Sequence, residues 1–439
     1  MRFSREISHA WSCEKRSALV LVTVLWVFVL MAIVAAGINL TSRLDTKVAM
    51  SGVEGKQKLW ACKGGLQMAM AVLIEDERDI DGFSDLWYEN EEDFNDLEIG
   101  EYLCSVVVTD EACKLNINSA TRNQLAALPN MTEEIADAII DWRDKDDNAS
   151  PGGAEDGYYL GLSFGYKCAN APFRTVRELL LVKDIDEAIL YGEDYNLNGQ
   201  LDTNERDGEK SVPYDNEDDV LDEGLFKYVT CYSYEDNKDS SGGDRVNINS
   251  ADESTLTQKL GIDSGQAKWI IEHRKYNGIG DLISSGSPKN KQPGGANNDQ
   301  AVAMDLETFK SIIDKITIAD GKIVYGKVNV NTAEREVLEA LFEGGSQAES
   351  IAASIITARE QQVEGIPDIG SLLDVDSMKV DDFKKIVDHV TVRSRVFRII
   401  CNAEKISQGY RASKLSCEAV VDRAEEDCRV LYWYQGASN

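Results

Sequence analysis

The pattern of apolar residues predicts one long helix at the start of the chain. Residues 18–37 read ALVLVTVLWVFVLMAIVAAG and carry no charge, and a bilayer-spanning helix needs roughly 20 such residues. Beyond this run, apolar residues recur at helical spacing as far as Glu77, among charged residues of both signs. Four glycines each disfavour the helix by up to about 1 kcal/mol, and they are Gly52, Gly55, Gly64 and Gly65. Because the pattern continues across them, we predict a membrane helix that continues as an amphipathic helix over residues 17–77.

Alternating apolar and polar residues predict strands in two regions that lie far apart in the chain. Residues 101–110, EYLCSVVVTD, form a β-branched run typical of a strand. Three further alternating segments near the C-terminus are separated by turn-like residues, and they are 390–403, 412–423 and 428–434. These three predict an antiparallel meander, which the first strand extends to a four-stranded sheet for the long helix to cover. Residues 78–98 are acidic and polar, and we expect a loop there with at most a short helix.

Three similar segments occupy the middle of the chain: LNINSATRNQLAAL at 115–128, VNINSADESTLTQKL at 246–260 and VNVNTAEREVLEAL at 328–341. Each begins with an alternating strand, [LV]-N-[IV]-N, and passes through [ST]-A into a helix. A second helical segment follows each of them. Each unit ends with a Phe-Lys segment that finishes in a short strand and begins at Phe226, Phe309 or Phe383. Self-similarity of this kind indicates repeated supersecondary units.

The junction between strand and helix in each repeat carries residues that favour a helix start. We expect Ser119, Ser250 and Thr332 to be N-caps. Ser250 also has Glu253 three residues further on, which is the spacing of a capping box. The repeats resemble helix-hairpin-helix units, which in many proteins bind the DNA backbone.

The charge of the chain argues against DNA as a partner. Lys and Arg total 46 and Asp and Glu total 77, and the net charge of −31 repels phosphate. The first two hairpins, LPNMTEE and KLGIDSG, place Glu133, Glu134 and Asp263 where a phosphate would lie. We therefore expect a helical scaffold for protein contacts and no nucleic acid. The three scattered histidines, and the lack of a carboxylate pair in aromatic or histidine surroundings, argue against an enzyme.

The nine cysteines leave two interpretations open. No C-x-x-C pair occurs, which argues against zinc and thioredoxin-type chemistry. If Cys13 is removed with a leader, eight remain, an even number that could form disulfides in an oxidising compartment. They could equally be buried free thiols. Cys401, Cys417 and Cys428 lie close together in the C-terminal strands and are candidates for pairing.

A calcium-binding loop is predicted at residues 194–205, DYNLNGQLDTNE. The loop fits the pattern D-x-[DN]-x-[DN]-G-x5-E, with Gly199 at the sharp turn. Carboxylate and carbonyl oxygens are the ligands that Ca²⁺ prefers. The expected ligands are Asp194, Asn196, Asn198, the backbone carbonyl of Gln200, Asp202 and Glu205. The alternative is a merely polar loop.

A second acidic cluster lies within DWRDKDDNASPGGAEDGYY, which begins at Asp141. The spacing of Asp144, Asp146 and Asn148 is D-x-D-x-N, and Glu155 and Asp156 follow closely. These five residues form a second candidate calcium site. The alternative is a solvated, charged turn.

The residues before the apolar run indicate the orientation of the chain in a membrane. Arg2, Arg5, Lys15 and Arg16 place the N-terminus in the cytoplasm and the bulk of the chain in the periplasm or outside the cell. A secretory signal peptide cut near Gly37, an uncleaved anchor and a pilin-type leader cut before the apolar helix are the three alternatives. Only the last explains why the helix continues beyond the membrane. We expect cleavage between Arg16 and Ser17.

Several segments, in their order, resemble one family: SALVLVTVLWVFVL, A-x-x-I-x-DWRD-x-D, GGAED-x-YY, KCANAPFRTVRELLLV, the [LV]-N-[IV]-N-[ST]-A repeats and EAVVDR-x4-CRVLYW. The chain resembles the general secretion pathway protein K family, the minor pseudopilin K of type II secretion. The resemblance implies a tip subunit of the periplasmic pseudopilus that assists export of folded proteins across the outer membrane. It implies the minor pseudopilins I and J as partners, a single pass through the inner membrane, processing by prepilin peptidase, and calcium in an inserted helical domain.

Three details of the sequence bear on this resemblance. Counted from Ser17, position 5 is Leu21, where other pilins carry a glutamate. The protein K family also lacks that glutamate, so this position agrees with the resemblance. Family leaders normally end in Gly, whereas Arg16 stands here, and the third repeat makes this chain longer than familiar members. The alternatives are a minor pilin of a type IV pilus, an exported DNA-binding helix-hairpin-helix protein and a secreted calcium-dependent enzyme.

Together these patterns predict an α+β fold. A pilin-like long N-terminal helix packs on a small antiparallel sheet, into which a large α-helical region of helix-hairpin-helix or SAM-like repeats is inserted. The predicted order is a leader at 1–16, the helix at 17–77, the first part of the sheet domain at 78–114, helical units at 115–240 with the calcium loop, 241–325 and 326–388, and closing strands at 389–439.

Overall fold

The computed structural model divides the chain into two compact units, Met1–Ala61 and Cys62–Asn439. It describes residues 6–88, 90–195, 197, 199, 201, 205, 206, 208–210, 215–283, 302–405, 414–424 and 427–438, with the backbone alone for residues 6–19, 91, 209, 437 and 438.

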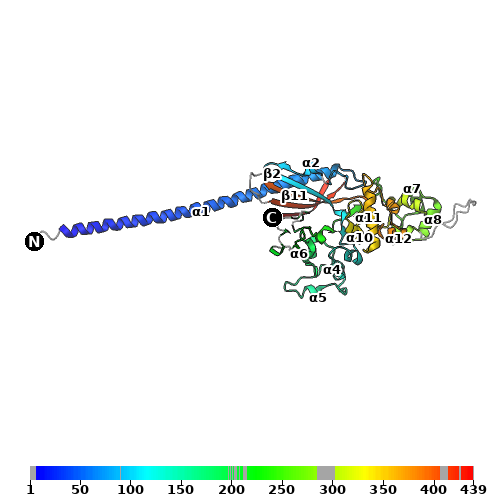
Figure 1. Ribbon diagram of the computed structural model, residues 1–439, viewed down its shortest axis with the longest axis horizontal. Coiled ribbons are helices and arrows are strands. Elements are labelled where there is room, and N and C mark those ends of the chain that lie inside the picture. Colours follow the sequence, from blue (N-terminus) through cyan, green and yellow to red (C-terminus); the bar gives the residue numbers. More distant parts are fainter. Residues whose placement is uncertain are drawn as a thin grey trace, which may run out of the picture. The chain divides into compact units, whose positions relative to one another are not determined.

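The predicted N-terminal helix is confirmed as α1, which runs from Glu6 to Glu75 (Figure 1). In the first unit, every side chain from Val20 to Met50 is exposed, although most of the first half of this stretch is apolar. By length and composition, α1 is the described helix that is apolar enough to cross a membrane. The expected end at Glu77 lies two residues beyond the observed one.

The second unit contains a five-stranded antiparallel sheet in the order β1-β2-β11-β12-β13. Its strands are β1 (Leu97–Ile99), β2 (Tyr102–Asp110), β11 (Val396–Lys405), β12 (Lys414–Arg423) and β13 (Cys428–Ser438). The prediction of an antiparallel sheet is confirmed, but the strand count was wrong. The segment expected to be a loop contains the short helix α2 (Glu91–Phe94) and also β1, which pairs with β2 through a tight turn at Gly100.

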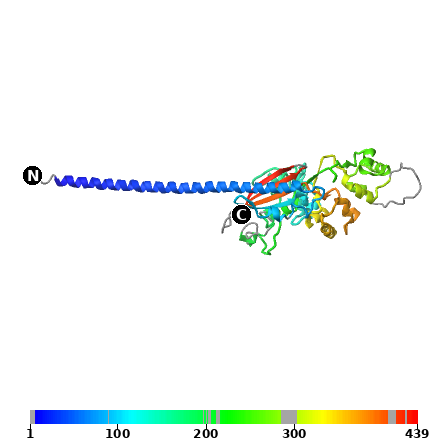
Figure 2. The ribbon, with the colours of Figure 1, turned by 90° about the horizontal axis from the view of Figure 1, so that it is seen from above.

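The last turns of α1 pack on one face of this sheet, where Figure 2 shows the helix crossing the strands. Ala69 and Leu73 are fully buried there. A Cβ atom on Gly65 would lie 2.7 Å from Cys401 Sγ, and one on Gly64 would lie 2.9 Å from Ile99 Cδ1. These two glycines weaken the helix locally, but their lack of a side chain lets α1 approach the strands closely.

Three short parallel strand pairs organise the helical region between β2 and β11. They are β3 (Leu115–Asn116) with β4 (Val229–Thr230), β6 (Val246–Asn247) with β7 (Ile316–Thr317), and β9 (Val328–Asn329) with β10 (Val390–Thr391). In each pair the first strand is the start of an N-x-N motif, and the second is the end of the Phe-Lys segment. Residues 390 and 391 therefore belong to a repeat, and the prediction that they begin a strand of the large sheet was wrong.

Along the chain, the helices of the region lie between the two strands of each pair. A continuous hydrophobic core joins these helices. The first pair encloses α3 (Arg122–Ala126), α4 (Glu133–Arg143), α5 (Asp156–Tyr159), η2 (Val176–Leu181), α6 (Glu187–Tyr191), η4 (Gly208–Lys210) and η5 (Leu225–Lys227). The second encloses α7 (Glu253–Leu260), α8 (Ser264–Glu272), η6 (Ile279–Leu282), α9 (Leu306–Ile312) and η7 (Ile313–Lys315). The third encloses α10 (Arg335–Leu341), α11 (Ser346–Glu360), η8 (Ile369–Asp374) and α12 (Val380–Ile386). An antiparallel pair, β5 (Tyr234–Asp236) with β8 (Ile323–Tyr325), joins the segments that link the repeats.

The second asparagine of each N-x-N motif makes the same two hydrogen bonds to a distant backbone position. Asn118 donates to the Phe173 carbonyl at 3.0 Å and accepts from the Phe173 amide at 2.8 Å. Asn249 does the same with Tyr276 at 3.0 and 2.8 Å, and Asn331 with Ile366 at 3.0 and 2.7 Å. We call this pair of bonds the asparagine clasp. It fixes the segment after the second helix against the start of each repeat.

An arginine near the end of each second helix completes the arrangement. Arg143 donates to the carbonyls of Ile117 and Ala120, both of which belong to the motif. Arg274 and Arg359 make the equivalent pairs of bonds in the other repeats, to Ile248 and Ala251 and to Val330 and Ala333. The motif therefore recurs because its polar atoms satisfy buried backbone groups that no regular element pairs.

The predicted N-caps at Ser119, Ser250 and Thr332 were wrong. The helices begin two residues later, after Thr121, Asp252 and Glu334. The physical reason is a turn formed by the first asparagine of each motif, whose side-chain oxygen accepts from the amide two residues on at 2.9–3.0 Å. Ser250 lies within that turn, and Glu253 is the first residue of α7, so the predicted capping box does not form.

A buried polar cluster joins the end of β2 to the third repeat. Asp110 is almost fully buried and accepts hydrogen bonds from the hydroxyls of Thr332 and Ser394, each at 2.6 Å. Asp81, also buried, binds the Arg423 guanidinium at 2.6 Å. Burial raises the pKa of Asp110 to about 6 and that of Asp81 to about 7.

We predict that Asn331→Ala destabilises the third repeat. It would leave the buried amide and carbonyl of Ile366 unpaired, at about 1–3 kcal/mol for each group. Denaturant unfolding of the full chain in detergent measures the loss, and Asn123→Ala, at an exposed helix position, is the matched control. Equal unfolding midpoints for the two variants would show that the clasp contributes nothing.

We also predict a pH dependence of stability that originates in Asp110. Because its folded pKa is raised, the folded state holds this proton more tightly, so the contribution to stability is complete below pH 4 and is lost as the pH rises to about 6. Asp110→Asn should therefore lose less stability than the wild type between these pH values, by a few kcal/mol at most. Unfolding measured from pH 4 to 7 tests this, with the exposed Asp376→Asn as control. Parallel curves for the wild type and Asp110→Asn would contradict the assignment.

Candidate functional site

The predicted calcium loop lies directly after α6 in the first repeat. The structure describes two of its six expected ligands, Asp194 and Glu205, and both side chains are buried. The amide of Gly199 donates to Asp194 Oδ2 at 2.9 Å, and Gly199 has a φ of +66°. The loop thus turns back on its first carboxylate, as a calcium loop of this pattern requires. Asn196, Asn198, Gln200 and Asp202 lie outside the described residues, so this ligand set stays a prediction.

The base of the loop is closed by backbone pairing. Gly192 and Glu223 form an antiparallel bridge, and the amide of Glu193 donates to the Asp222 carbonyl at 2.7 Å. The buried Glu193 carboxylate accepts from the amides of Asn216 and Asp222 at 3.2 and 3.0 Å. The first ligand, Asp194, is therefore held next to a closed stem.

The second acidic cluster surrounds the N-terminus of α5. Glu155, the residue before that helix, is 6% exposed, and neither of its carboxylate oxygens has a hydrogen-bond partner among the described residues. The side-chain oxygen of Asn170 is likewise buried without a partner in that part of the chain. Burial and the negative charges of Asp141, Asp144 and Asp147 raise the pKa of Glu155, while the nearby Cys168 thiol offsets part of the rise. A buried carboxylate in such surroundings favours a bound cation.

Among the described residues, the structure does not bring the five predicted ligands of this cluster to one point. Asp144 and Glu155 lie close enough to interact. Asp146 and Asn148 are exposed, and Asp146 Oδ1 accepts from the backbone amide and side chain of Asn148 at 2.9 and 2.7 Å. Asp156 accepts from the Cys168 amide at 2.8 Å. The D-x-D-x-N segment therefore forms a surface turn, in which the amides of Asp146 and Asn148 donate to the carboxylates two residues before them.

Two residues of this cluster lay outside the predicted ligand set. Asp141 is fully buried in the last turn of α4, and its two oxygens accept from the amide and hydroxyl of Ser150 at 2.9 and 2.7 Å. Asn170 contributes the unpartnered oxygen, and its amide nitrogen donates to Asp147 at 2.9 Å. The position of Asp141 on the apolar side of α4 could have indicated from the sequence that this carboxylate is buried. Nothing in the residue spacing indicated that Asn170 belongs to the cluster. Asp141, Asp144, Glu155 and Asn170 offer oxygen ligands of the kind that calcium prefers. Among the described residues, the group whose carboxylate oxygens lie within 4.8 Å of one another is Asp76, Asp81 and Asp85.

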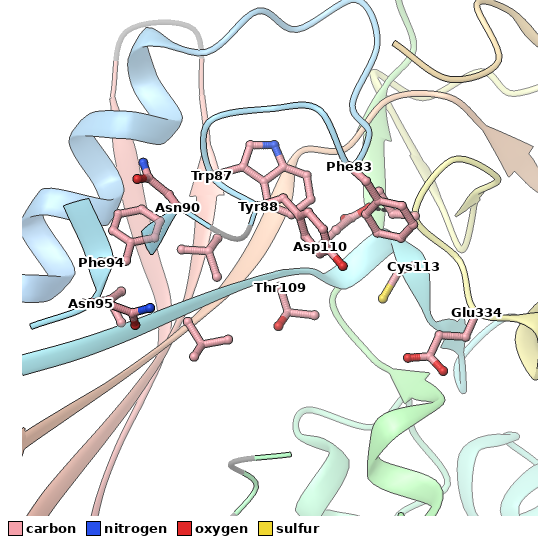
Figure 3. Close-up of a pocket in the computed structure, with 14 residues that line it drawn as sticks. Phe83, Trp87, Tyr88, Asn90, Phe94, Asn95, Thr109, Asp110, Cys113 and Glu334 are labelled. Atoms are coloured by element: carbon pink, nitrogen blue, oxygen red, sulfur yellow. Dashed lines mark hydrogen bonds between the residues drawn. The ribbon is translucent and has the colours of Figure 1, made fainter. Parts of the chain in front are cut away.

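A separate pocket of about 850 Å³ lies beside β2 (Figure 3). Aromatic side chains from the segment before β1, among them Phe83, Trp87 and Phe94, line it together with β2 itself. Trp87 is buried and packs edge-to-face on Phe397 of β11 with ring centroids 5.2 Å apart. Asp110 and Glu334 lie at one end of the pocket. The lining is suited to packing against apolar groups.

Comparison with known proteins relates two of the three repeats to one family. Two protein-family models, both described as Type II secretion system, protein K, match residues 114–191 and 328–393. The first match contains the second acidic cluster and ends just before the calcium loop. The second match covers the whole third repeat, from β9 to β10.

Curated relatives and a solved structure agree with these matches. A Type II secretion system protein K from Pseudomonas aeruginosa is 29% identical over 193 residues, which cover 38% of this chain and 57% of that protein. One from Klebsiella pneumoniae is 26% identical over 197 residues, 40% of this chain and 60% of that protein. The matched region thus spans less than two thirds of either relative. A chain in the crystal structure of the GspK-GspI-GspJ complex from enterotoxigenic Escherichia coli has the same fold, with a TM-score of 0.50 at 15% identity over 89% of this chain and 99% of that one. Over residues 114–191 and 328–393, the chain is similar to the type II secretion system protein K family.

Proposed function

We propose that this chain is a minor pseudopilin of type II secretion that initiates or caps the pseudopilus and assists the export of folded proteins. The observation that carries the proposal is α1 itself. Its first half exposes apolar side chains from Val20 onward, and its last turns are buried on an antiparallel sheet. One helix that is suited to a membrane at one end and completes a folded domain at the other is what a pilin-like subunit requires.

The anchor sets the location. We place the apolar part of α1 in the inner membrane as a single pass and the second unit in the periplasm, because basic residues precede the apolar run. Prepilin peptidase would cut between Arg16 and Ser17 on the cytoplasmic side. Leu21, five residues into the processed chain, carries no charge to pair with the N-terminus of a subunit below, which suits a position at the tip.

The partners follow from the related complex. The solved structure that shares this fold contains GspI and GspJ with GspK, and we propose the minor pseudopilins I and J as the partners of this chain. The helical repeats would serve as a scaffold of helix-hairpin-helix or SAM-like type for protein contacts. Their first hairpin carries Glu133 and Glu134 in the opening turn of α4, where phosphate would be repelled.

We further propose that the first repeat binds calcium at two structural sites. The unpartnered Glu155 carboxylate and the unpartnered Asn170 oxygen support the site around α5, and the turn of Gly199 onto Asp194 supports the loop site. A bound Ca²⁺ supplies positive charge to oxygen ligands. At the first site Asp141, Asp144, Glu155 and Asn170 would hold it, so that the end of α4 is fixed to the start of α5.

We predict that deletion of this chain in its native host abolishes the release of exported proteins into the medium, and that the wild-type gene restores it. The N-terminal peptide of the restored protein, measured by mass spectrometry of membrane extracts, should begin at Ser17. As a control, the deletion strain should contain its resident periplasmic proteins at the same levels as the wild type. Unchanged secretion after deletion, or a protein that begins at Met1 or near Gly37, would contradict the proposal.

We predict that Glu155→Gln loses one equivalent of bound calcium while Asp194→Asn loses the other. Each substitution removes a charged oxygen ligand, so affinity at that site should fall at least about tenfold. Calorimetric titration of the full chain in detergent with CaCl₂ measures both stoichiometry and affinity. Asp376→Asn, an exposed carboxylate in the third repeat, should leave both unchanged. A Glu155→Gln protein that binds as much calcium as the wild type would refute the site around α5.

A further inference from the structure

The outer edge of β2 is open beyond its first residues. β11 pairs with β2 along its whole length, from Tyr102 to Asp110. On the other side, β1 pairs with residues 102–104 alone. Within the described part of the chain no other strand joins this side, so the edge is unpaired from Ser105 to Asp110. An unpaired edge presents a row of N–H and C=O groups that another extended chain can bind.

The turn before β2 shows which of its peptide groups face this open side. A two-residue turn at Gly100 joins β1 to β2, and Tyr102 is the first residue after it. The residues that close such a turn are hydrogen-bonded to each other, so the N–H of Tyr102 points toward β1. The direction alternates along a strand, so the N–H and C=O groups of Val106 and Val108 point to the same side. Among the described residues, none forms a hydrogen bond with these groups.

A cavity of about 850 Å³ lies along this open side (Figure 3). Val106 and Val107 both line it, although their side chains lie on opposite faces of the sheet. A cavity that touches both faces of one strand lies at the edge of that strand. Trp87 and Phe94, from the segment before β1, are buried beside it. A strand added to β2 would lie about 4.8 Å beyond the edge and so within this cavity.

Each face of the sheet offers contacts for apolar side chains at this edge. A Cβ atom on Gly65 would lie 3.0 Å from Val106 Cγ2, so α1 covers the face to which Val106 points. Val107 points to the other face and is 51% exposed. A second cavity, of about 500 Å³, lies on that face, and Ile400 and Phe226 are among the residues that line it. The side chains of an added strand would alternate between the two cavities.

The rim of the first cavity is acidic. Residues 89–96, ENEEDFND, contain five carboxylates and no basic residue, and three residues of this segment line the cavity. Glu92 and Asp96 of the segment are exposed. Glu334 lies at the other end of the cavity, where it pairs with Lys227 at 3.0 Å. Among the described residues that line the cavity, none is Lys or Arg. Such a rim favours a partner with basic residues.

We propose that the open edge of β2 binds an extended segment of a partner protein as an added strand. The segment carries apolar side chains at alternate positions and Lys or Arg at its ends. A peptide backbone is required because it offers donors and acceptors at the spacing of Val106 and Val108, while the cavities select its side chains. A second copy of this chain matches the acidic rim poorly, because its net charge is −31.

This surface does not depend on the proposed role in secretion. Every residue that forms it lies in the second unit, so it requires neither the membrane helix nor export. A strand added here would extend the five-stranded sheet on the side away from β13. The opposite edge of the sheet therefore serves as an internal control.

Binding of a designed peptide to the full chain in lipid nanodiscs tests the proposal. The probe is the acetylated and amidated peptide KVTVTVTK, which has alternating valines and a lysine at each end. Its control carries a methyl group on every internal backbone nitrogen, which keeps the side chains and removes the N–H donors. The probe should bind saturably, and the control at least about tenfold more weakly. Amide hydrogen exchange, followed by mass spectrometry, should slow in residues 105–110 and stay unchanged in β13.

Substitutions locate the binding surface. Val107→Lys should weaken binding of the probe at least about tenfold, because it places a charge among the apolar contacts. Val430→Lys is the matched control, since this valine is 43% exposed on the edge strand β13. Glu92→Gln combined with Asp96→Asn should weaken binding severalfold at low salt and less at high salt, where the charges of the wild type are screened.

The proposal is overturned if the probe shows no saturable binding at about 1 mM, where even a weak complex forms, or if the methylated control binds equally. Slower exchange in β13 instead of β2, or equal weakening by Val107→Lys and Val430→Lys, would exclude the edge of β2. Slow exchange at residues 105–110 without peptide, lost on dilution of the protein, would place a second copy on the edge and overturn the proposed partner.

Discussion

Arg398 is buried in the sheet, and the attachment of the first repeat depends on the two carboxylates that hold it. Its guanidinium donates to Glu111, which follows β2, at 2.5 Å and also to Glu418 of β12. Glu111 in turn binds the Thr230 hydroxyl in β4, and Glu418 binds Arg177 in η2 at 2.8 Å. Removal of either carboxylate would leave a buried charge partly unpaired, typically at about 3–5 kcal/mol. The repeat is therefore held to the sheet by interactions that are satisfied only when both are folded.

The other two repeats are joined in the same way, by buried polar groups. Glu235 of β5 accepts from Arg245 at the start of the second repeat and from Thr391 at the end of the third, each within hydrogen-bond distance. Asn329 of the third repeat donates to the Asp81 carbonyl at 3.0 Å, next to the ion pair of Asp81 with Arg423. Polar joints have strict geometry, whereas apolar contacts tolerate sliding. A large insertion can thus keep a defined attachment to a small sheet.

The sequence predicted those features that depend on local periodicity. The long helix, the antiparallel strands and the three repeats all follow from spacing that one segment carries by itself. The asparagine clasp could not be predicted, because the partner of Asn118 lies 55 residues away. The N-cap prediction failed for a local reason: Ser119 is a favourable N-cap residue, but its amide donates to the Asn116 carbonyl and so Ser119 belongs to the preceding turn. At the second acidic cluster, spacing identified Asp144 and Glu155, whereas the contribution of Asn170 depends on the fold.

The glycines of α1 show how a local weakness can encode a tertiary requirement. Gly64 and Gly65 lower helix propensity, yet the helix runs through them because the sheet beneath supplies packing that an isolated helix does not have. Cys62, Gly65, Ala69 and Leu73 follow one another at intervals of three or four residues and form the buried stripe. Their small size at the first positions brings the helix axis close to β2 and β11, and the larger leucine fills the space further along. The exposed apolar stretch and this narrow stripe are two different surfaces of one helix. The apolar stretch ends at Gly37, and the buried stripe begins at Cys62, where the second unit begins.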